Sequence, residues 1–271
     1  MNRERDEAVA GLFYPKNSGT LEREVKGLLS NSSPSAVHPI KILIVPHAGY
    51  SYSGQTAADS YIEIVKGKYK RVVLLGPSHH FGFNGIVSCD AKYWKNPTGK
   101  MEVEQGVIQG VQPGFQYHAP EHSLEVQIPL IHQILPDTLI NPLLISGNRV
   151  SASKFAQILS PLDDKETLWV ISSDFTHYGP RFGYNPKFNQ YRNGEDLDKR
   201  ALEIIQNRDI SGFNQFLQET GATICGALPI LIAMHLSESW DLPPFTLKKH
   251  TSSGAITGDY KDSVGYAAMY C

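Results

Sequence analysis

The sequence predicts a layered α/β/α fold in which helices cover both faces of a mixed, largely parallel central sheet. Three observations support this prediction. Short apolar runs rich in β-branched residues recur along the chain, helical segments lie between them, and neither an internal repeat nor a low-complexity linker interrupts the 271 residues. Because 41% of the residues are hydrophobic, the chain can bury one large core. We therefore expect a single domain over residues 1–271.

The first half of the chain begins this alternation of helices and strands. Residues 18–30 repeat apolar side chains at the spacing of a helix. Residues 40–45 and 71–75 are apolar without polar alternation, which indicates strands buried on both faces of a sheet. A helix over residues 54–65 separates these two strands, and Ser53 is its expected N-cap.

The second half continues the pattern. We expect a helix over residues 123–135 that Pro129 kinks, whereas the glycine-rich residues 81–120 favour hairpins and loops. Further strands are expected at residues 139–145, 167–172, 245–250 and 264–270. Late helices are expected at residues 195–207, 209–219 and 227–240.

Composition argues against several classes of protein. Charged residues make up 19% of the chain and give a formal net charge of -2, without the Lys/Arg cluster of a nucleic-acid binder. The longest apolar run, residues 228–234, is too short to cross a bilayer. The three cysteines are too few and too widely spaced for a disulfide framework, and the charged N-terminus does not resemble a signal peptide. We expect a soluble, cytoplasmic protein that binds neither nucleic acid nor membrane.

Histidines follow three of the predicted strands directly. His47 follows residues 40–45, His79 and His80 follow residues 71–75, and His177 follows residues 167–172. Loops at the carboxyl ends of strands line the ligand crevice of open α/β sheets, so these imidazoles should converge on one site. Each could instead be hydrogen-bonded locally, but three equivalent positions among only 10 histidines favour a common function.

Adjacent side chains of an extended segment point in opposite directions, so His79 and His80 cannot both face this site. We choose His79 because it is nearer the strand end, and His80 remains the alternative.

Cys225 lies at the start of a predicted helix. Gly221 ends the preceding helix, and Pro229 suits the first turn of the next one. A thiol at a helix N-terminus meets the positive end of the helix dipole, which favours the thiolate and makes it a competent metal ligand or nucleophile. The alternative interpretation is an ordinary small buried cysteine.

Two further groups carry acidic and imidazole side chains together. Residues 121–125, which contain Glu121 and His122, open a predicted helix, where acidic groups can cap the helix or instead orient a ligand. Asp174 lies three residues before His177, so its carboxylate could fix the tautomer of that imidazole.

Taken together, these segments resemble the Memo family, and the resemblance covers nearly the whole chain. The Phe13-Tyr14-Pro15 opening is more similar to the bacterial and archaeal members, the AmmeMemoRadiSam system protein B-like proteins. The resemblance rests on seven segments in the order of the family: Ala10-Gly11-Leu12-Phe13-Tyr14-Pro15, Pro46-His47-Ala48-Gly49-Tyr50 with Ser53-Gly54, Gly76-Pro77-Ser78-His79-His80, Glu121-His122-Ser123-Leu124-Glu125, Ser172-Ser173-Asp174-Phe175-Thr176-His177-Tyr178, Thr223-Ile224-Cys225-Gly226 and Val264-Gly265-Tyr266-Ala267.

The resemblance implies a fold related to class III extradiol dioxygenases, in which two histidines and a glutamate hold non-haem Fe(II). In Memo-like proteins a cysteine replaces the carboxylate, and the matching positions are His47, His79 and Cys225. A thiolate shifts the metal preference toward copper, iron or zinc, and three protein ligands leave coordination positions open. His177, Asp174 and His122 are the candidate acid/base or substrate-contacting residues.

These observations support three hypotheses. The first is a redox-active metalloprotein with iron or copper at the His/His/Cys site, similar to an oxygenase or oxidoreductase. The second is a binding module that holds a peptide or small molecule in the same cleft without turnover, because animal Memo proteins are implicated in phosphotyrosine-peptide recognition. The third is a zinc hydrolase in which the open position activates water. The resemblance also implies radical SAM and AMMECR-type proteins as partners.

Overall fold

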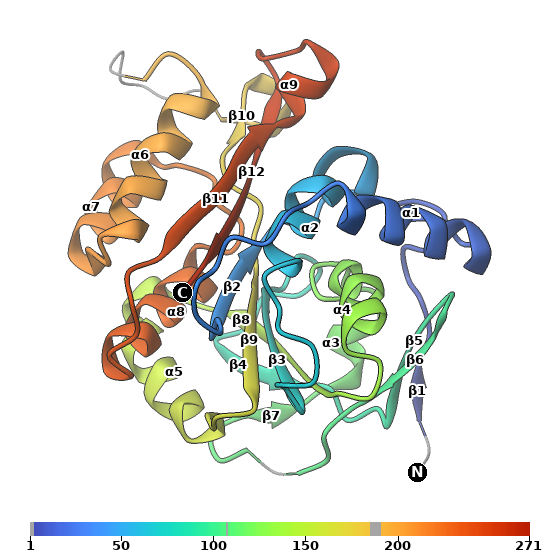
Figure 1. The fold of residues 1–271 in the computed structure, drawn as a ribbon. Helices are drawn as coiled ribbons and strands as arrows, with labels where there is room; N and C mark the ends of the chain where they lie inside the picture. Colours follow the sequence, from blue (N-terminus) through green and yellow to red (C-terminus); the bar gives the residue numbers. More distant parts are fainter. Residues whose placement is uncertain (1–2, 107, 185–190) are drawn as a thin grey trace.

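We analysed a computed structural model of the chain, which describes residues 3–106, 108–184 and 191–271. A mixed sheet forms its centre, with strand order β10-β12-β2-β9-β3-β8-β4-β7 and with β11 paired to β12 (Figure 1). The bounds of these strands are β2 Ile42–Val45, β3 Arg71–Pro77, β4 Gly85–Ser88, β7 Gln112–Pro113, β8 Leu139–Ser146, β9 Thr167–Ser172, β10 His177–Tyr178, β11 Thr246–Ser252 and β12 Ser263–Tyr270.

Four neighbouring strands in the middle of this sheet, β2, β9, β3 and β8, run parallel to one another. On one side of these four strands, β12 pairs antiparallel with β2, and β10 and β11 each pair antiparallel with β12. On the other side, β4 pairs antiparallel with β8. The predicted mixed sheet is thus confirmed, with parallel strands at its centre and antiparallel strands on either side. Parallel pairing matters for function because it brings the carboxyl ends of β2, β9 and β3 to the same edge.

Alternate residues of the parallel strands enter two separate hydrophobic clusters, one on each face of the sheet. In β2, Ile42 and Ile44 belong to one cluster, whereas Leu43 and Val45 belong to the other. All four are fully buried, as expected for a strand that lacks polar alternation. The three layers of the predicted α/β/α fold follow directly from this burial on both faces.

Helices supply the outer layers (Figure 1). One cluster includes side chains of α5 Ala152–Leu159, α6 Gly194–Gln206, α7 Ile210–Thr220 and α8 Ala227–Ser239. The other includes side chains of α1 Ser18–Ser30, α2 Gln55–Tyr61 and α4 Ile128–Ile134. The described α-helices also include two short ones, α3 Phe115–His118 and α9 Ser253–Thr257.

The region for which hairpins and loops were expected contains a small second sheet. Strands β5 Tyr93–Asn96 and β6 Gly99–Glu102 form an antiparallel hairpin, and β1 Glu4–Arg5 pairs parallel with β5. The N-terminal segment therefore docks beside residues nearly 90 positions away, as Figure 1 shows at the lower right. This pairing brings Arg5 into the protein interior.

Two local predictions were wrong. Ser53 does not cap a helix: it lies in a π-helical turn over Tyr50–Gly54, and its hydroxyl donates to the Ala48 carbonyl at 2.9 Å. Pro129 does not kink a helix, because it occupies the first turn of α4, where a missing N–H costs nothing. The residues before it form a separate 3-10 turn, Glu125–Gln127.

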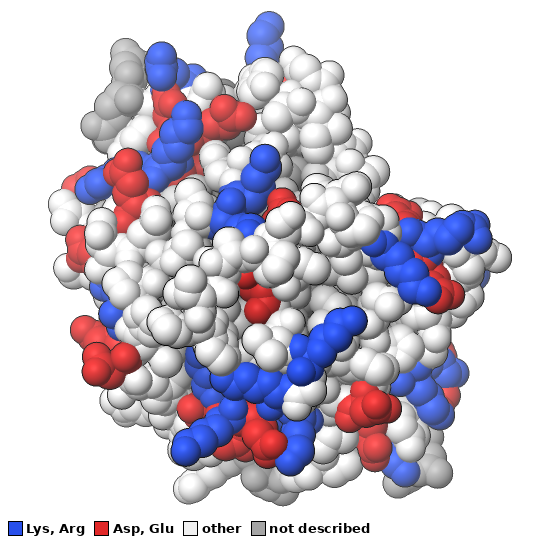
Figure 2. All heavy atoms as spheres, in the orientation of Figure 1, with Lys and Arg blue, Asp and Glu red and all other residues white. Residues whose placement is uncertain are grey.

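Surface and membrane features agree with the composition. Figure 2 shows Lys and Arg interspersed with Asp and Glu on the visible face, without a large area of one sign. In the part of the chain that the structure describes, no helix combines the length and apolar character needed to cross a bilayer.

Candidate metal centre

Two of the three predicted strand-end imidazoles, those of His47 and His79, come together at one edge of the sheet, whereas His177 lies in β10 and is not part of the group of close imidazoles. His47 follows β2, His79 follows β3, and Asp174 follows β9, which lies between those two strands. Because all three strands are parallel, their carboxyl ends deliver these side chains to one place.

Three imidazoles form the centre of this site. One ring nitrogen from each of His47, His79 and His122 lies within 4.8 Å of the others. The His79 and His122 rings stack with centroids 4.6 Å apart, and His47 meets each of them edge-on at 5.2 and 5.5 Å. His80 is exposed and lies outside this group, with its ring 6.4 Å from His122. Of the two alternatives, the structure therefore places His79 in the cluster.

Cys225 joins the cluster from the side of His47. Its Sγ lies 3.3 Å from His47 Nε2 and accepts the backbone N–H of Asp174 at 3.1 Å. The residue lies two positions before α8, in a segment that follows Gly221. Gly221 has φ 67° and ends α7 in the left-handed conformation, as predicted. Cys225 thus adjoins His47, whereas the three donors that all lie within 4.8 Å of one another are those of His47, His79 and His122.

Glu121 fixes the orientation of His79. Its Oε1 lies 2.9 Å from His79 Nδ1, and its Oε2 accepts the backbone N–H of His79 at 2.5 Å. A carboxylate only accepts hydrogen bonds, so His79 Nδ1 carries the hydrogen and His79 Nε2 keeps its lone pair. Burial of the Glu121 carboxyl opposes ionisation, yet the hydrogen bonds that it accepts from His79 hold its pKa well below the usual range. Glu121 therefore orients an imidazole rather than only capping a helix.

Burial keeps two of the imidazoles neutral. It lowers the pKa of His47 well below the usual value, and the neighbouring His79 adds to this effect. Burial likewise lowers the pKa of His122 to about 4. Neutral imidazoles have a free lone pair at physiological pH, which is the form that binds metal ions.

The expectation of a thiolate at Cys225 in the metal-free protein was wrong. Burial, followed by the charge of Asp174, raises the pKa of the Cys225 thiol far above its ordinary value. The reasoning from the helix dipole omitted both effects. A cation bound beside the sulfur would lower the pKa of the thiol, because it stabilises the thiolate.

Asp174 and His177 do not form the direct contact that we considered. Asp174 Oδ1 instead accepts the backbone N–H of His47 at 2.7 Å and of Ala48 at 3.3 Å, so the carboxyl shapes the loop that carries His47. His177 Nδ1 lies 3.1 Å from the Phe175 carbonyl. Between the two side chains the described residues show no hydrogen bond, although the charge of His177 affects the pKa values of both Asp174 and His47.

Sequence reasoning missed the role of Arg5. Its guanidinium is fully buried, pairs with Glu125, and donates to the carbonyls of His118 and Glu121. Glu125 also accepts the hydroxyl of Tyr14 at 2.6 Å. This network holds the N-terminal segment against the loop that carries Glu121 and His122. In the sequence, the only indication of this buried network was the close spacing of Glu121 and Glu125.

Gly226 allows Cys225 to approach the end of β9. A Cβ at Gly226 would lie 2.4 Å from Ser173 Cβ and 2.8 Å from the Ser172 carbonyl oxygen. We expect Gly226→Ala to displace the Cys225 segment and to lower the free energy of unfolding by about 1–3 kcal/mol, the usual cost of overpacking. Urea denaturation measures this loss. Gly27→Ala is the control, because the space beside Gly27 in α1 is open, and an equal effect in both variants would contradict the prediction.

A hollow of about 380 Å³ is lined by residues that follow β10 and by residues of α9 and β12, and His47, His79, His122 and Cys225 are not among them. Phe182 borders the hollow and packs edge-on against His177 with ring centroids 5.4 Å apart. The hollow combines aromatic and charged groups, and its lining includes Tyr52, Arg181, Phe182, Asp259, Asp262 and Tyr266. A molecule held there would contact Phe182, the aromatic neighbour of His177.

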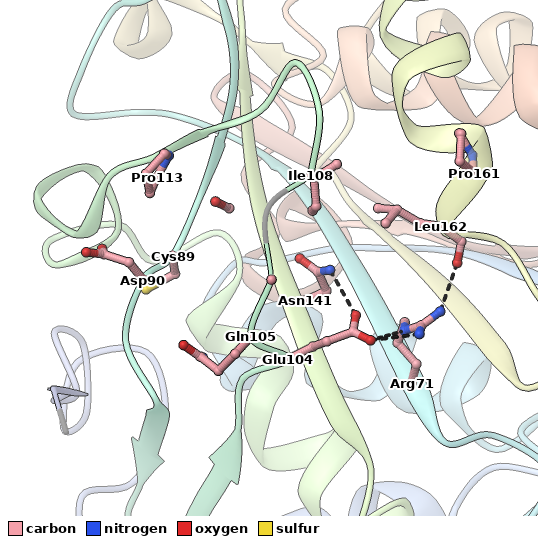
Figure 3. Close-up of a pocket in the computed structure, with 12 residues that line it drawn as sticks. Arg71, Cys89, Asp90, Glu104, Gln105, Ile108, Pro113, Asn141, Pro161 and Leu162 are labelled. Atoms are coloured by element: carbon pink, nitrogen blue, oxygen red, sulfur yellow. Dashed lines mark hydrogen bonds and ion pairs between the residues drawn. The ribbon is translucent and has the colours of Figure 1, made fainter. Parts of the chain in front are cut away.

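A second hollow, of about 280 Å³, contains polar groups that already satisfy one another (Figure 3). Arg71 Nη2 lies 2.7 Å from Glu104 Oε1, Asn141 Nδ2 donates to Glu104 Oε2 at 3.2 Å, and Arg71 Nη1 donates to the Leu162 carbonyl at 3.0 Å. Arg71 begins β3, so this hollow lies near the opposite end of the strand from His79. We therefore place the candidate function at the imidazole cluster.

Comparison with known proteins identifies the family of the chain. Residues 5–270 match the family described as Memo-like protein. The chain is 30% identical to "Protein memo-1 homolog" of Caenorhabditis elegans, over 97% of this chain and 81% of that protein. It is 32% identical to "MEMO1 family protein Mbar_A1422" of Methanosarcina barkeri, over 98% of each. The crystal structure of uncharacterized protein JW3007 from Escherichia coli K12 shares the fold alone, with TM-score 0.51 and 12% identity over 86% of this chain and 99% of that chain. The chain therefore belongs to the Memo-like protein family.

Proposed function

We propose that this protein binds a transition metal ion, iron or copper, through His47, His79 and Cys225, and that it is redox-active. Two observations support the proposal: ring nitrogens of His47 and His79 lie within 4.8 Å of each other, and Cys225 Sγ lies 3.3 Å from His47 Nε2. Glu121 directs the Nε2 lone pair of His79 away from the carboxylate, which is how metal-binding histidines are commonly held.

The donor set fits such an ion. Neutral imidazole nitrogen and thiolate sulfur are ligands for copper, iron and zinc, and three protein ligands leave positions open. When bound, the ion would supply Lewis acidity or electron transfer. The chain would supply orientation through Glu121 and Asp174, and His177 would hold or move a proton at its Nε2, because its Nδ1 lies against backbone carbonyls.

A zinc-dependent hydrolase is the second candidate, and the three-histidine group favours it. His47, His79 and His122 form a set of the kind that holds catalytic zinc, with a fourth position for water. A peptide or small molecule held without turnover is a third candidate, favoured by the hollow that Phe182 borders. Association with radical SAM and AMMECR-type proteins stays a prediction from family resemblance.

Metal binding by matched variants tests these candidates. The protein is purified without oxygen, its metal content is measured, and Cu(I), Fe(II) and Zn(II) affinities are determined for Cys225→Ser and His122→Ala. Cys89→Ser and His132→Ala are the controls, because those residues lie outside the cluster and hydrogen-bond elsewhere.

We expect Cys225→Ser to weaken Cu(I) binding by about 100-fold, at the upper end of the effects seen when a metal site loses a supporting group. His122→Ala should have the larger effect on Zn(II) if the three-histidine set is used. Oxygen-dependent turnover would separate the redox protein from the hydrolase. Affinities that match those of the controls in both variants would exclude the metal site.

A further inference from the structure

Ser172, the last residue of β9, contacts three groups at the back of His47. Its hydroxyl oxygen lies 2.6 Å from the Ser123 carbonyl oxygen, 2.9 Å from Gln127 Nε2 and 2.9 Å from His47 Nδ1. The serine is fully buried, as is Gln127. A buried hydroxyl with three partners has one hydrogen and two lone pairs to distribute among them, so the chemistry of the partners decides each direction.

Gln127 can only donate to Ser172. Its Nε2 lies 2.9 Å from the Pro46 carbonyl oxygen, which accepts but cannot donate. Its Oε1 accepts the Tyr61 hydroxyl at 3.0 Å. A reversed amide would place two oxygens against each other at Pro46, so the packing fixes the amide with its NH2 group toward Ser172.

The single hydrogen of Ser172 is committed to the Ser123 carbonyl, because that oxygen also only accepts. Ser172 Oγ must therefore accept from both Gln127 and His47. It follows that His47 Nδ1 carries a hydrogen. His47 Nε2 then keeps its lone pair, and this nitrogen lies 3.3 Å from Cys225 Sγ, within the cluster.

We propose that Ser172, oriented by Gln127 and Tyr61, is a positioning residue that locks His47 in its Nδ1–H tautomer. The assignment of the tautomer rests on the hydrogen-bond directions alone, whereas its consequence for metal affinity rests on the proposed function. The lock matters because the opposite tautomer would carry a hydrogen on Nε2, where it could donate to Cys225 Sγ. That hydrogen bond would occupy both donor atoms and block a metal ion.

The tautomer of His47 is fixed by a neutral hydroxyl, whereas that of His79 is fixed by a carboxylate. Glu121 places a carboxylate behind His79, whereas a hydroxyl stands behind His47. Because a carboxylate increases the basicity of the imidazole that donates to it, His79 should be the stronger electron donor of the pair. The two histidines are therefore not equivalent as ligands.

Nitrogen-15 NMR of the metal-free protein tests the tautomer directly. Two-bond proton–nitrogen spectra distinguish a protonated from an unprotonated ring nitrogen, and a His47→Ala sample identifies the signals of His47. We expect a protonated Nδ1 and an unprotonated Nε2 in the unaltered chain. A protonated Nε2 there would overturn the proposal.

Ser172→Ala tests the consequence of losing the acceptor. We expect this variant to populate the Nε2–H tautomer and to bind Zn²⁺ about 10–100-fold more weakly by calorimetry, the usual cost of removing an outer partner of a metal ligand. Ser60→Ala is the matched control, because Ser60 is equally buried but hydrogen-bonds to the Ile44 carbonyl away from the cluster.

Two results distinguish this inference from the proposed function. If Ser172→Ala keeps both the tautomer and the Zn²⁺ affinity of Ser60→Ala, Ser172 is not a positioning residue. If the unaltered chain shows the Nδ1–H tautomer but binds no Zn²⁺, Cu(I) or Fe(II), the tautomer assignment is supported and the metal-binding function is wrong.

Discussion

Replacing Arg5 by methionine is expected to lower the free energy of unfolding by about 3–5 kcal/mol, because this change leaves the buried carboxylate of Glu125 without its counter-charge. Both side chains are fully buried. The guanidinium also donates to the His118 carbonyl at 3.0 Å and the Glu121 carbonyl at 2.7 Å, and it lies over the ring of Trp94. Methionine keeps much of the volume but supplies none of these donors.

Urea denaturation of the metal-free protein measures the effect. The double variant Arg5→Met/Glu125→Gln should recover part of the loss, since it leaves no unpaired buried charge. Lys26→Met, which breaks an exposed pair with Glu22, is the control and should cost less than about 1 kcal/mol. A loss for Arg5→Met no larger than that of Lys26→Met would contradict the prediction.

Local sequence patterns were sufficient to predict the middle of the sheet and the edge that carries the site. The aliphatic side chains of β2 are all removed from water only when both faces of the sheet are covered. Strands of this kind are typical of parallel sheets. Once β2, β3 and β9 are parallel, the positions of His47, His79 and Asp174 follow from the chain direction.

The contacts between loops could not be predicted in this way. Glu121 reaches His79 across 42 residues, and no periodicity relates the two positions. Arg5 belongs to a charged N-terminal stretch that resembles a solvated surface, and its burial depends on partners more than 110 residues away. The error at Cys225 has a related cause, because a helix position can be inferred locally but the burial of its thiol and the nearby Asp174 cannot.

Asp174 should reduce stability in the metal-free protein. Burial raises the pKa of its carboxyl to about 6, although the charge of His177 opposes this effect. An unfolded aspartate loses its proton near pH 4, so between pH 4 and about 6 the folded state binds a proton that the unfolded state has released. The free energy of unfolding therefore falls as the pH rises through this window. Above about pH 6 the Asp174 carboxyl is ionised in both states, and the whole free-energy cost of burying its charge lowers the stability of the folded protein.

We expect Asp174→Asn to increase the free energy of unfolding at pH 7 by about 3 kcal/mol, because the neutral amide avoids the buried charge. Its Oδ1 can still accept the backbone N–H groups of His47 and Ala48. Urea denaturation in the presence of a chelator, at pH 4 and pH 7, measures the gain.

The gain from Asp174→Asn should be absent at pH 4, where the native carboxyl is already protonated. Asp137→Asn, at an exposed position, is the control and should give the same stability as the unaltered protein at both pH values. A loss of stability at pH 7, or a gain that persists at pH 4, would contradict the assignment. In the presence of a bound cation the gain should shrink, because the positive charge stabilises the carboxylate that the metal-free fold disfavours. Residues that cost stability when the site is empty are expected where a fold maintains a functional site.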